Sequence, residues 1–294
     1  AEEQDPARPI VRESCARHAD GRAEVVREQP GANEKVNNLA GVLALAKHPL
    51  LLLADSDVRV SPDLACRVLE PFDDPKVGLV SCPYRATGLS TPGAVLEAAW
   101  IGLEFIPSVF LAARLGPVRF ALGATIALRR EALDAIGGFA AIRDHLADDF
   151  QLGARIAAAG WKVQLASAFV DLWTSPLGLR DFLLHQVRWA RTIRVCNPVG
   201  HFFSVLSRPI LFALLAAAVE PTSPWAVGAV AATFGVRIAT GVVNALAQGC
   251  EGKVVLAALL SPLQELLSTV VWLLSWGGRT VVWRGRRFEL DAEG

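Results

Sequence analysis

The sequence predicts an α/β domain with a mainly parallel sheet, followed by a membrane region of apolar helices. Before about residue 195, short apolar runs such as 50–54 alternate with helical patterns, which is typical of strands joined by helices in one sheet. Charged residues are also concentrated in this part, whereas long apolar stretches follow it. We therefore predict an α/β domain over 1–200 and a membrane region over 201–294, with two to three apolar helices and a basic C-terminal tail.

The composition indicates a membrane protein and predicts no nucleic-acid partner. The 294 residues include 29 basic and 29 acidic side chains, so no net charge favours a polyanion. Hydrophobic residues make up 52% of the chain and the mean hydropathy is +0.37, both high for a soluble protein. The five cysteines are widely spaced without a Cys-x-x-Cys pair, which favours reduced packing residues over a disulfide framework or a zinc site.

Periodicity and capping residues place the individual elements of the first region. A glycine pair at 137–138 closes one helical pattern, and the segment 61–63 opens another. The stretch 94–115 holds one acid, Glu104, and is equally compatible with a core helix and with a helix lying in the bilayer interface. The predicted helices are 6–18, 35–46, 129–136 and 150–159, and the predicted strands are 23–27, 50–54, 77–82 and 121–128.

Three apolar segments follow residue 200, at about 202–219, 225–248 and 254–276. The last two are long enough to span a bilayer, whereas Arg208 and Pro209 interrupt the first, which makes it an interfacial segment or a kinked span. Basic residues flank the group on both sides, and such residues favour the cytoplasmic side. We therefore expect an even number of spans, two with one in-plane segment. The flanking residues are Arg188, Arg191, Arg194, Arg279, Arg284, Arg286 and Arg287.

Asp55 and Asp57 directly follow the apolar run 50–54 as an Asp-Ser-Asp tripeptide. A short apolar run before polar residues is typical of a buried strand whose carboxyl end opens into a crevice. Two carboxylates two residues apart at such an end can hold Mg²⁺ or Mn²⁺, which can in turn neutralise a diphosphate. An ordinary acidic turn after a strand is the alternative interpretation.

Three further segments carry residues suited to moving a sugar from a nucleotide diphosphate. Lys35 opens a helix after a glycine turn, where its ammonium group and the helix amides can meet phosphate; a surface lysine is the alternative. Asp149 can take the proton of an acceptor hydroxyl, although capping of the helix that follows also explains it. Arg188 can stabilise diphosphate charge and Trp189 can form an apolar wall, or the pair can anchor a membrane edge.

The order and spacing of these segments resemble the ceramide glucosyltransferase-like family of membrane glycosyltransferases, which have a GT-A catalytic domain with a Rossmann-like nucleotide-sugar fold. The resemblance covers essentially the whole chain. It includes an aspartate before Pro-Ala, a G-x-N-x-K-x-x-N-L segment, a D-S-x-x-R-V segment, an acidic-Asp-aromatic segment and an x-x-R-W segment. The matching residues are Asp5, Asn33, Lys35, Asn38, Asp55, Arg59, Val60, Asp149, Arg188 and Trp189.

The resemblance implies an inverting glycosyltransferase that moves a sugar from UDP-glucose or UDP-N-acetylglucosamine to the hydroxyl of a membrane lipid, of the hopanoid or ceramide type. It implies that a Mg²⁺ or Mn²⁺ cofactor is held by Asp55 and Asp57. The catalytic residues that it implies are Asp149, Arg188 and Trp189. The residues that it implies in binding of the nucleotide sugar are Asp5, Asn33, Lys35, Asn38, Asp55 and His185.

His185 stands where the family has glutamine or arginine, three residues before Arg188. The run His-x-x-Arg-Trp-Ala-Arg-Thr-Ile-Arg is most similar to the bacterial branch associated with hopanoid biosynthesis, which attaches N-acetylglucosamine to a hopanoid lipid. This similarity implies a multi-pass protein of the bacterial inner membrane, with its catalytic domain on the cytoplasmic side.

Members of the family begin with a membrane helix, a first strand carrying part of the nucleotide pocket, and the strand that ends at the first aspartate. Asp5 stands almost at the start here, so the resemblance implies an N-terminally truncated GT-A domain whose first strands are missing. Two other functions stay open. A processive polysaccharide synthase shares the D-x-D and x-x-R-W elements, and a catalytically dead membrane protein would follow from loss of the first strands.

Overall fold

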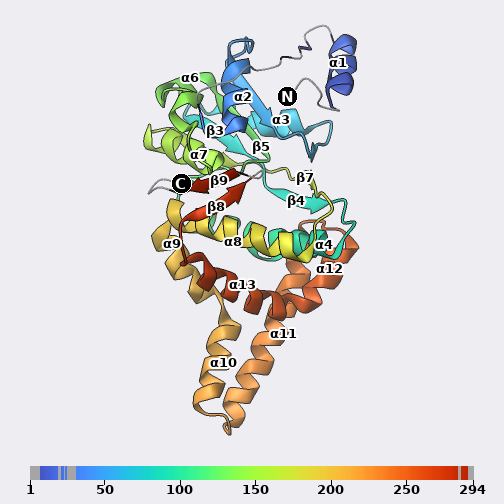
Figure 1. The fold of residues 1–294 in the computed structure, drawn as a ribbon, viewed down its shortest axis with the longest axis vertical. Coiled ribbons are helices and arrows are strands. Elements are labelled where there is room, and N and C mark those ends of the chain that lie inside the picture. Colours follow the sequence, from blue (N-terminus) through green and yellow to red (C-terminus); the bar gives the residue numbers. More distant parts are fainter. Residues whose placement is uncertain (1–6, 19–20, 23, 25–30, 284–285, 291–294) are drawn as a thin grey trace.

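The structure, a computed structural model, describes residues 7–18, 21–22, 24, 31–283 and 286–290. The predicted site residue Asp5 and all but residue 24 of the predicted strand 23–27 lie outside the described residues. Figure 1 shows three tiers: strands covered by helices at the top, a layer of helices lying across the molecule, and a helical hairpin that projects away from both.

The central sheet has four strands in the order β1-β5-β3-β6. β5 (Thr125–Arg129) runs antiparallel to both of its neighbours, β1 (Leu50–Ala54) and β3 (Val77–Ser81). β3 is parallel to β6 (Lys162–Leu165). The predicted α/β architecture is confirmed, but the sheet is mixed instead of mainly parallel. The reason is that β5 begins beside the last residues of β1 and β3 and therefore runs in the opposite direction to both.

Two smaller sheets connect this tier to the rest of the molecule. β7 (Val170–Trp173) lies between β2 (Val58–Arg59), to which it is antiparallel, and β4 (Tyr84–Thr87), to which it is parallel. β8 (Thr280–Trp283) and β9 (Arg286–Glu289) form a hairpin near the C-terminus. This hairpin reaches back to the top tier, where an arginine of β9 lies 3.1 Å from the first residue of α2.

β1 lies at the edge of the central sheet, and the prediction that it is a buried strand is wrong. Leu51 is buried, but Leu52 is 47% exposed. Among the described strands of this sheet, β1 pairs only with β5, so one side of the strand is not covered by a second neighbour. An apolar groove runs along it, lined in part by Leu39 of α2 (Glu34–Leu43) and by Phe139.

Several helices of the top tier pack on the central sheet around a shared core that includes Leu128, Leu133 and Ile156. The glycine stop at 137–138 is confirmed, since both glycines have a positive φ of 87° and 71°, which residues with a Cβ rarely adopt. The four helices predicted before residue 160 are confirmed. The elements of this tier are α1 (Arg8–Arg17), α2, α3 (Leu64–Leu69), η1 (Glu70–Asp73), α6 (Arg130–Ala135), η3 (Phe139–Ile142) and α7 (Asp148–Ala158).

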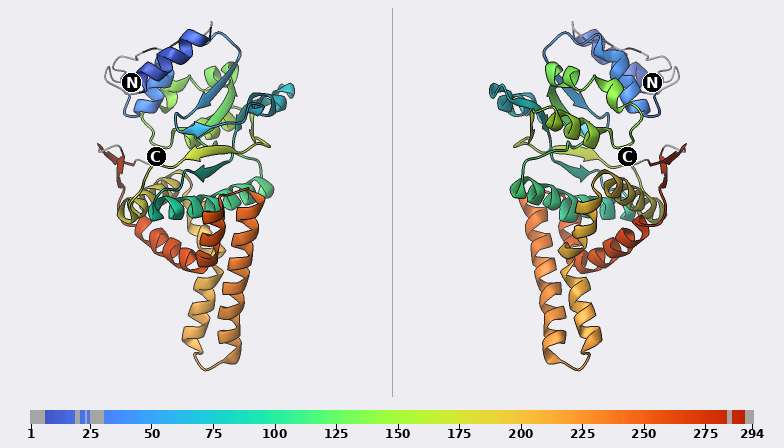
Figure 2. Two further views of the ribbon diagram at one scale, coloured as in Figure 1. Left: turned by 90° about the vertical axis from the view of Figure 1, so that its right-hand side faces the viewer. Right: turned by 90° about the vertical axis from the view of Figure 1, so that its left-hand side faces the viewer.

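A layer of helices lies beneath the strands and runs across the molecule (Figures 1 and 2). α4 (Pro92–Trp100) continues through a wider π-helical turn, Ile101–Phe105, into α5 (Ile106–Leu115). Pro107 has no amide hydrogen to donate to the preceding turn, which accounts for the irregularity. The other members of the layer are α8 (Leu179–Cys196), α12 (Gly252–Ala257), η5 (Ala258–Leu260) and α13 (Ser261–Ser275).

The segment 94–115 combines the two possibilities that its sequence leaves open. Ile101, Leu103 and Ile106 are at most 1% exposed and belong to the core under the strands. Towards the end of α5, Leu111 and Leu115 are 56% and 79% exposed. The helix is therefore a core helix along one part of its surface and an uncovered apolar surface at its C-terminal end.

α10 (Pro209–Val219) and α11 (Pro224–Ala247) form the hairpin that projects from the layer (Figure 2). α9 (Pro198–Phe203) and η4 (Ser204–Ser207) precede it, and the chain bends by 60° between η4 and α10. The described residues include three helices long and apolar enough to cross a membrane, or up to four if the bent pair is one span. Pro224–Ala247 is only 6% buried, whereas Pro92–Leu115 and Gly252–Ser275 are 56% and 50% buried.

Residues on both sides of position 200 share one hydrophobic core. Ala245 of α11 and Val254 of α12 belong to the same buried cluster as Leu103 and Ile106. The change of composition near residue 200 therefore separates charged from apolar sequence, while the two regions pack as one body.

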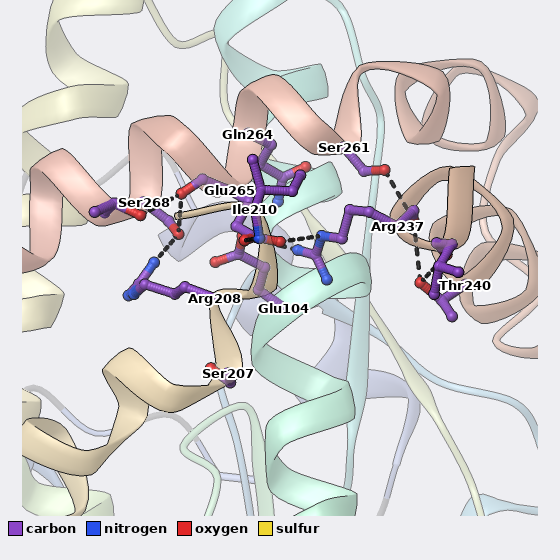
Figure 3. Close-up of polar contacts among 12 residues, drawn as sticks. Glu104, Ser207, Arg208, Ile210, Arg237, Thr240, Ser261, Gln264, Glu265 and Ser268 are labelled. Carbon is purple, nitrogen blue, oxygen red and sulfur yellow. Dashed lines mark hydrogen bonds and ion pairs between the residues drawn. The ribbon is translucent and has the colours of Figure 1, made fainter. Parts of the chain in front are cut away.

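Two acids and two arginines are largely buried where the hairpin joins the helical layer (Figure 3). Arg237 of α11 lies 3.0 Å from Glu104 of the π-helical turn and 3.3 Å from Glu265 of α13. Arg208 is the second cation, and it donates to the Ser268 hydroxyl of α13. Charged groups are tolerated away from water only when they are paired in this way.

The same cluster holds the first turn of α10. Oε1 of Glu265 accepts a hydrogen bond from the Ile210 amide at 2.8 Å, and a carboxylate at this end of a helix is also favoured by the helix dipole. Because Glu265 binds both α10 and Arg237 of α11, it attaches both arms of the hairpin to α13.

Replacing Arg237 with leucine should weaken this junction, because Glu104 and Glu265 would then share a buried site without their closest cation. Breaking a buried pair in this way typically costs about 3–5 kcal/mol. We expect a clearly lower midpoint of thermal unfolding for the full chain in detergent micelles. Thr240→Ala is the matched control, since Thr240 is exposed on the same helix and bonds only to that helix. An unchanged midpoint in the Arg237 variant would contradict a stabilising role of the pair.

Candidate active site

Four segments that lie far apart in the sequence meet around the ammonium group of Lys35. Its Nζ lies 2.8 Å from Oδ1 of Asp55 and 3.8 Å from Oδ2 of Asp148. It also donates to the carbonyl of Gly123 at 3.3 Å. The first turns of α2 and α7 are thereby joined to the carboxyl end of β1 and to the start of β5. We call Lys35, Asp55, Asp148 and Asp149 the Lys35 cluster.

Asn33 fixes the position of Lys35 in the first turn of α2. Its side-chain oxygen accepts from the amides of Lys35 and Val36 at 3.0 and 3.2 Å, which caps α2. Its Nδ2 donates to the His145 carbonyl at 2.9 Å and to Oδ1 of Asp148 at 3.3 Å. Asn33 is only 1% exposed, so it acts by holding α2 against the start of α7.

The antiparallel pairing of β1 with β5 brings Asp55 to the turn before β5. The Asp55 amide donates to the Ala124 carbonyl at 3.1 Å. Gly123 leaves room for Asp149, because a Cβ at position 123 would lie 2.9 Å from Oδ2 of that carboxylate. Oδ1 of Asp149 accepts from the Phe150 amide at 2.8 Å. The structure therefore brings Lys35, Asp55 and Asp149 together, as the sequence predicts.

The carboxylates of Asp148 and Asp149 are easier to protonate than ordinary aspartates, because their pKa values are raised. Burial raises the pKa of Asp148 to about 6, and the charge of Lys35 offsets this only in part. Burial likewise raises the pKa of Asp149. Burial alone would lower the pKa of Lys35, but the charges of Asp148 and Asp55 outweigh it and the pKa lies above its usual value. Lys35 is thus a permanent cation beside acids that can exchange a proton.

Asp57 lies in the turn after β1 and is exposed, with no side-chain bond to any described residue. Within the described part of the chain, no group of three or more His, Cys, Asp or Glu side chains could hold a metal ion by itself. Mg²⁺ commonly takes only one or two protein carboxylates together with substrate phosphates. Asp55 and Asp57 therefore do not form a closed protein cage, and a metal ion at this position would need further ligands such as the oxygens of a diphosphate.

His185, Arg188 and Trp189 lie on α8, and we call them the α8 group. The Trp189 ring lies 4.8 Å from the His185 ring and 5.7 Å from the Phe105 ring, between centroids. Burial lowers the pKa of Arg188, and the charge of Glu97 partly offsets this. The Arg188 guanidinium makes no bond to another described residue, and a partly buried guanidinium of this kind suits an anionic ligand.

Tyr84 of β4 packs on Phe105, which in turn contacts Trp189 of the α8 group. Its side chain is 7% exposed, and its ring lies 5.8 Å from the Phe105 ring. Burial raises the pKa of Tyr84, and the charges of Asp149, Glu97 and Asp55 raise it further. The Tyr84 hydroxyl therefore lies within electrostatic reach of carboxylates from the top tier and from the helical layer.

Asn38 is a predicted site residue on α2 that the structure does not bring to the Lys35 cluster. It is exposed on α2, while the neighbouring Asn37 donates to the Gly31 carbonyl at 2.7 Å. No role in the site was predicted for Asp148 from the sequence, although its position beside Asp149 was a usable signal. Tyr84 and Glu97 were missed because no local pattern marks residues whose partners lie on other elements.

The family described as Glycosyl transferase family 21 matches residues 1–294. The chain belongs to glycosyl transferase family 21. The family-21 chain is 25% identical to Ceramide glucosyltransferase 3 of Caenorhabditis elegans over 165 residues, and to Ceramide glucosyltransferase 1 of that organism over 169 residues. Each alignment covers 56% of this chain and 36% of the relative, so the matched part spans about a third of the curated relatives. The predicted family resemblance is confirmed, whereas the hopanoid branch stays a prediction.

Among solved structures, the family-21 chain is similar to a mannosyltransferase from Pyrobaculum calidifontis in complex with GDP-Man and Mn²⁺. The sequence identity is 20% and the TM-score is 0.45, with 92% of this chain and 74% of the other covered. A likeness at this level carries no information about the donor or the metal of the family-21 chain.

Replacing Asp148 with asparagine should change how stability depends on pH. The folded-state pKa of Asp148 is raised from 3.8 to about 6, so its contribution to folding is present below the lower value and is lost as the pH rises through the upper one. The asparagine variant has no such loss. We therefore expect its midpoint of thermal unfolding to rise relative to that of the unchanged chain across this interval. Asp73→Asn, at an exposed position, is the control, and a pH-independent difference would refute the assignment.

Proposed function

We propose that this chain is an inverting glycosyltransferase with a GT-A-like domain, which moves a sugar from a UDP-sugar to the hydroxyl of a hopanoid- or ceramide-type membrane lipid. The meeting of Asp55, Asp149 and Lys35 in one cluster carries the proposal, in a chain of glycosyl transferase family 21. The two relatives named as ceramide glucosyltransferases support a lipid acceptor. The donor sugar in this proposal is glucose or N-acetylglucosamine.

Asp149 is the general base of the proposed reaction. Its carboxylate takes the proton of the lipid hydroxyl as that oxygen attacks the anomeric carbon. The new C–O bond forms opposite the leaving group, the bond to UDP breaks, and the configuration of the anomeric carbon inverts. Burial raises the pKa of Asp149, which suits a base that works closer to neutral pH. The amide of Phe150 orients the carboxylate.

Arg188 binds the diphosphate in this proposal, because its partly buried guanidinium has no described protein partner. Asp55 and Asp57 would hold Mg²⁺ or Mn²⁺, which when bound compensates the charge of the departing UDP. Trp189 forms an apolar wall together with Phe105 beside it.

We propose that the α10–α11 hairpin enters the membrane while the helical layer lies along the membrane surface. α11 has 24 residues and is therefore about 36 Å long, enough to cross the hydrocarbon core. Its apolar side chains are uncovered, including Trp225 at 88% exposure, which is the surface that lipid would contact. The segment 254–276 then takes the in-plane role that sequence reasoning assigned to 202–219.

We further propose that the chain is a multi-pass protein of the bacterial inner membrane, with the strands, the Lys35 cluster and the α8 group on the cytoplasmic side. The α8 group lies in the layer between the strands and the hairpin (Figure 1). A lipid held by the layer would therefore present its hydroxyl between the membrane and Asp149.

Incubating membranes that contain the full-length protein with labelled UDP-glucose or UDP-N-acetylglucosamine tests the proposal. We expect lipid carrying a single labelled sugar after extraction and chromatography. A labelled polymer would instead indicate a processive polysaccharide synthase. No labelled product from either donor, combined with no heat of binding on titration with UDP, would indicate a catalytically inactive membrane protein.

Asp149→Asn should reduce sugar transfer by about 10²–10⁴-fold, which is the usual contribution of a general base. Binding of UDP should stay nearly unchanged, because asparagine keeps the shape of the side chain and the bond from the Phe150 amide. The labelled-lipid assay and UDP calorimetry measure the two effects separately. Full activity in this variant would exclude Asp149 as the base.

Asp57→Asn should weaken the Mn²⁺-dependent part of UDP binding without lowering the midpoint of thermal unfolding, because the Asp57 side chain has no described partner. Asp55→Asn should lower both, since the Asp55 carboxylate also pairs with Lys35 at 2.8 Å. UDP titrations with Mn²⁺ and with EDTA make the comparison. If the difference in UDP affinity between Mn²⁺ and EDTA is the same in both variants as in the unchanged chain, Asp55 and Asp57 are not part of the metal site.

A further inference from the structure

Glu97 of α4 is a buried carboxylate that the proposed reaction does not use. It is 5% exposed, and both of its oxygens have partners on α8. Oε1 lies 3.0 Å from Nδ1 of His185, and Oε2 accepts from Nε2 of Gln186 at 2.7 Å. Gln186 is itself only 1% exposed, so the contact at Oε2 is made in the interior. These side-chain contacts of Glu97 are therefore both made to α8.

The contact with Glu97 determines which nitrogen of His185 carries the hydrogen. An ionised carboxylate only accepts hydrogen bonds, so the hydrogen between Glu97 and His185 belongs to Nδ1. In the neutral imidazole, Nε2 then has a lone pair and acts as an acceptor. The His185 side chain is 28% exposed, and no described residue bonds to its Nε2. Nε2 is thus an acceptor that remains available to a ligand.

His185 connects to the rest of the candidate site through a series of aromatic contacts. It contacts Trp189 of the same helix with ring centroids 4.8 Å apart, and Trp189 connects through Phe105 to Tyr84. The charges of Glu97 and of Asp149 both act on the Tyr84 hydroxyl. Arg188 follows His185 by three residues on α8, and residues at this spacing lie on the same face of a helix.

We propose that Glu97 is a positioning residue that holds His185 in the tautomer whose Nε2 accepts a hydrogen bond from a substrate hydroxyl. This inference rests on the proposed function. The oxygens of a diphosphate are themselves acceptors, so they do not suit a lone pair at Nε2, and the diphosphate is left to Arg188. The hydroxyl belongs to the sugar of the donor or to the lipid acceptor.

Steady-state kinetics of the full chain in lipid nanodiscs test the role of Glu97. In Glu97→Gln the amide can either accept from Nδ1 or donate to it, so the tautomer of His185 is no longer determined. We expect the KM of one substrate to rise about tenfold, equivalent to one hydrogen bond. A rise for the UDP-sugar assigns the hydroxyl to the donor, and a rise for the lipid assigns it to the acceptor. The Kd of UDP alone should not change, because UDP contains neither the transferred sugar nor the lipid to which the hydroxyl is assigned.

His185→Phe keeps an aromatic ring against Trp189 but removes Nε2, so it should raise the same KM. The double variant of Glu97 and His185 should be no worse than His185→Phe, because Glu97 acts through His185. If the increases in KM of the two single variants multiply in the double variant, the proposal is overturned. A higher Kd for UDP in Glu97→Gln would overturn it as well. Glu104→Gln is the matched control, since its partner Arg237 lies on α11; it should lower thermal stability and leave both KM values unchanged.

The pairing can also be tested without a substrate. Nitrogen NMR of the full chain with labelled histidine distinguishes the two tautomers of the imidazole, and His185→Phe assigns the His185 signal. We expect a hydrogen on Nδ1 in the unchanged chain and a mixture of tautomers in Glu97→Gln. A hydrogen on Nε2 in the unchanged chain would overturn the inference. Failure of the unchanged chain to bind UDP would overturn the proposed function instead, and the two results are distinguishable.

Discussion

The arrangement of the candidate site depends on the ammonium group of Lys35. Asp55, Asp148 and Asp149 come from the end of a strand and the start of a helix, and all three charges act on Lys35. Like charges brought together away from water repel strongly, so these elements can meet only around a cation. Asn33 supports this arrangement by capping α2, and Gly123 supports it by leaving space for Asp149.

The direction of β5 decides where this cluster forms. Because β5 is antiparallel to β1, the turn before β5 lies beside the residue that follows β1. That turn supplies the Gly123 carbonyl to Lys35 and the Ala124 carbonyl to the Asp55 amide. If all strands of the sheet were parallel, β5 would begin at the opposite end of the strands, away from the residue that follows β1. The mixed sheet is therefore a condition for the cluster.

Each long apolar segment of the helical layer carries a buried acid whose partner lies on another helix. Glu97 of α4 binds α8, while Glu104 and Glu265 both bind Arg237 of α11. Apolar helices can pack on one another in many registers, and a buried charge that must find its partner excludes most of them. These pairs account for how the helical layer and the hairpin keep a defined position relative to each other.

The sequence by itself determined the elements whose signals are local, such as the helix that opens near Lys35, the glycine stop at 137–138 and the polar residues after β1. It also placed Lys35, Asp55 and Asp149 in one site through their family resemblance. Only the tertiary structure decided that β1 is an edge strand, that the four-residue strands β4, β6 and β7 exist, and that Asn38 faces solvent. It alone paired Glu97 with His185. The physical reason is distance along the chain: caps and turns are made within a few residues, whereas strand pairing and buried ion pairs join residues that no local pattern connects.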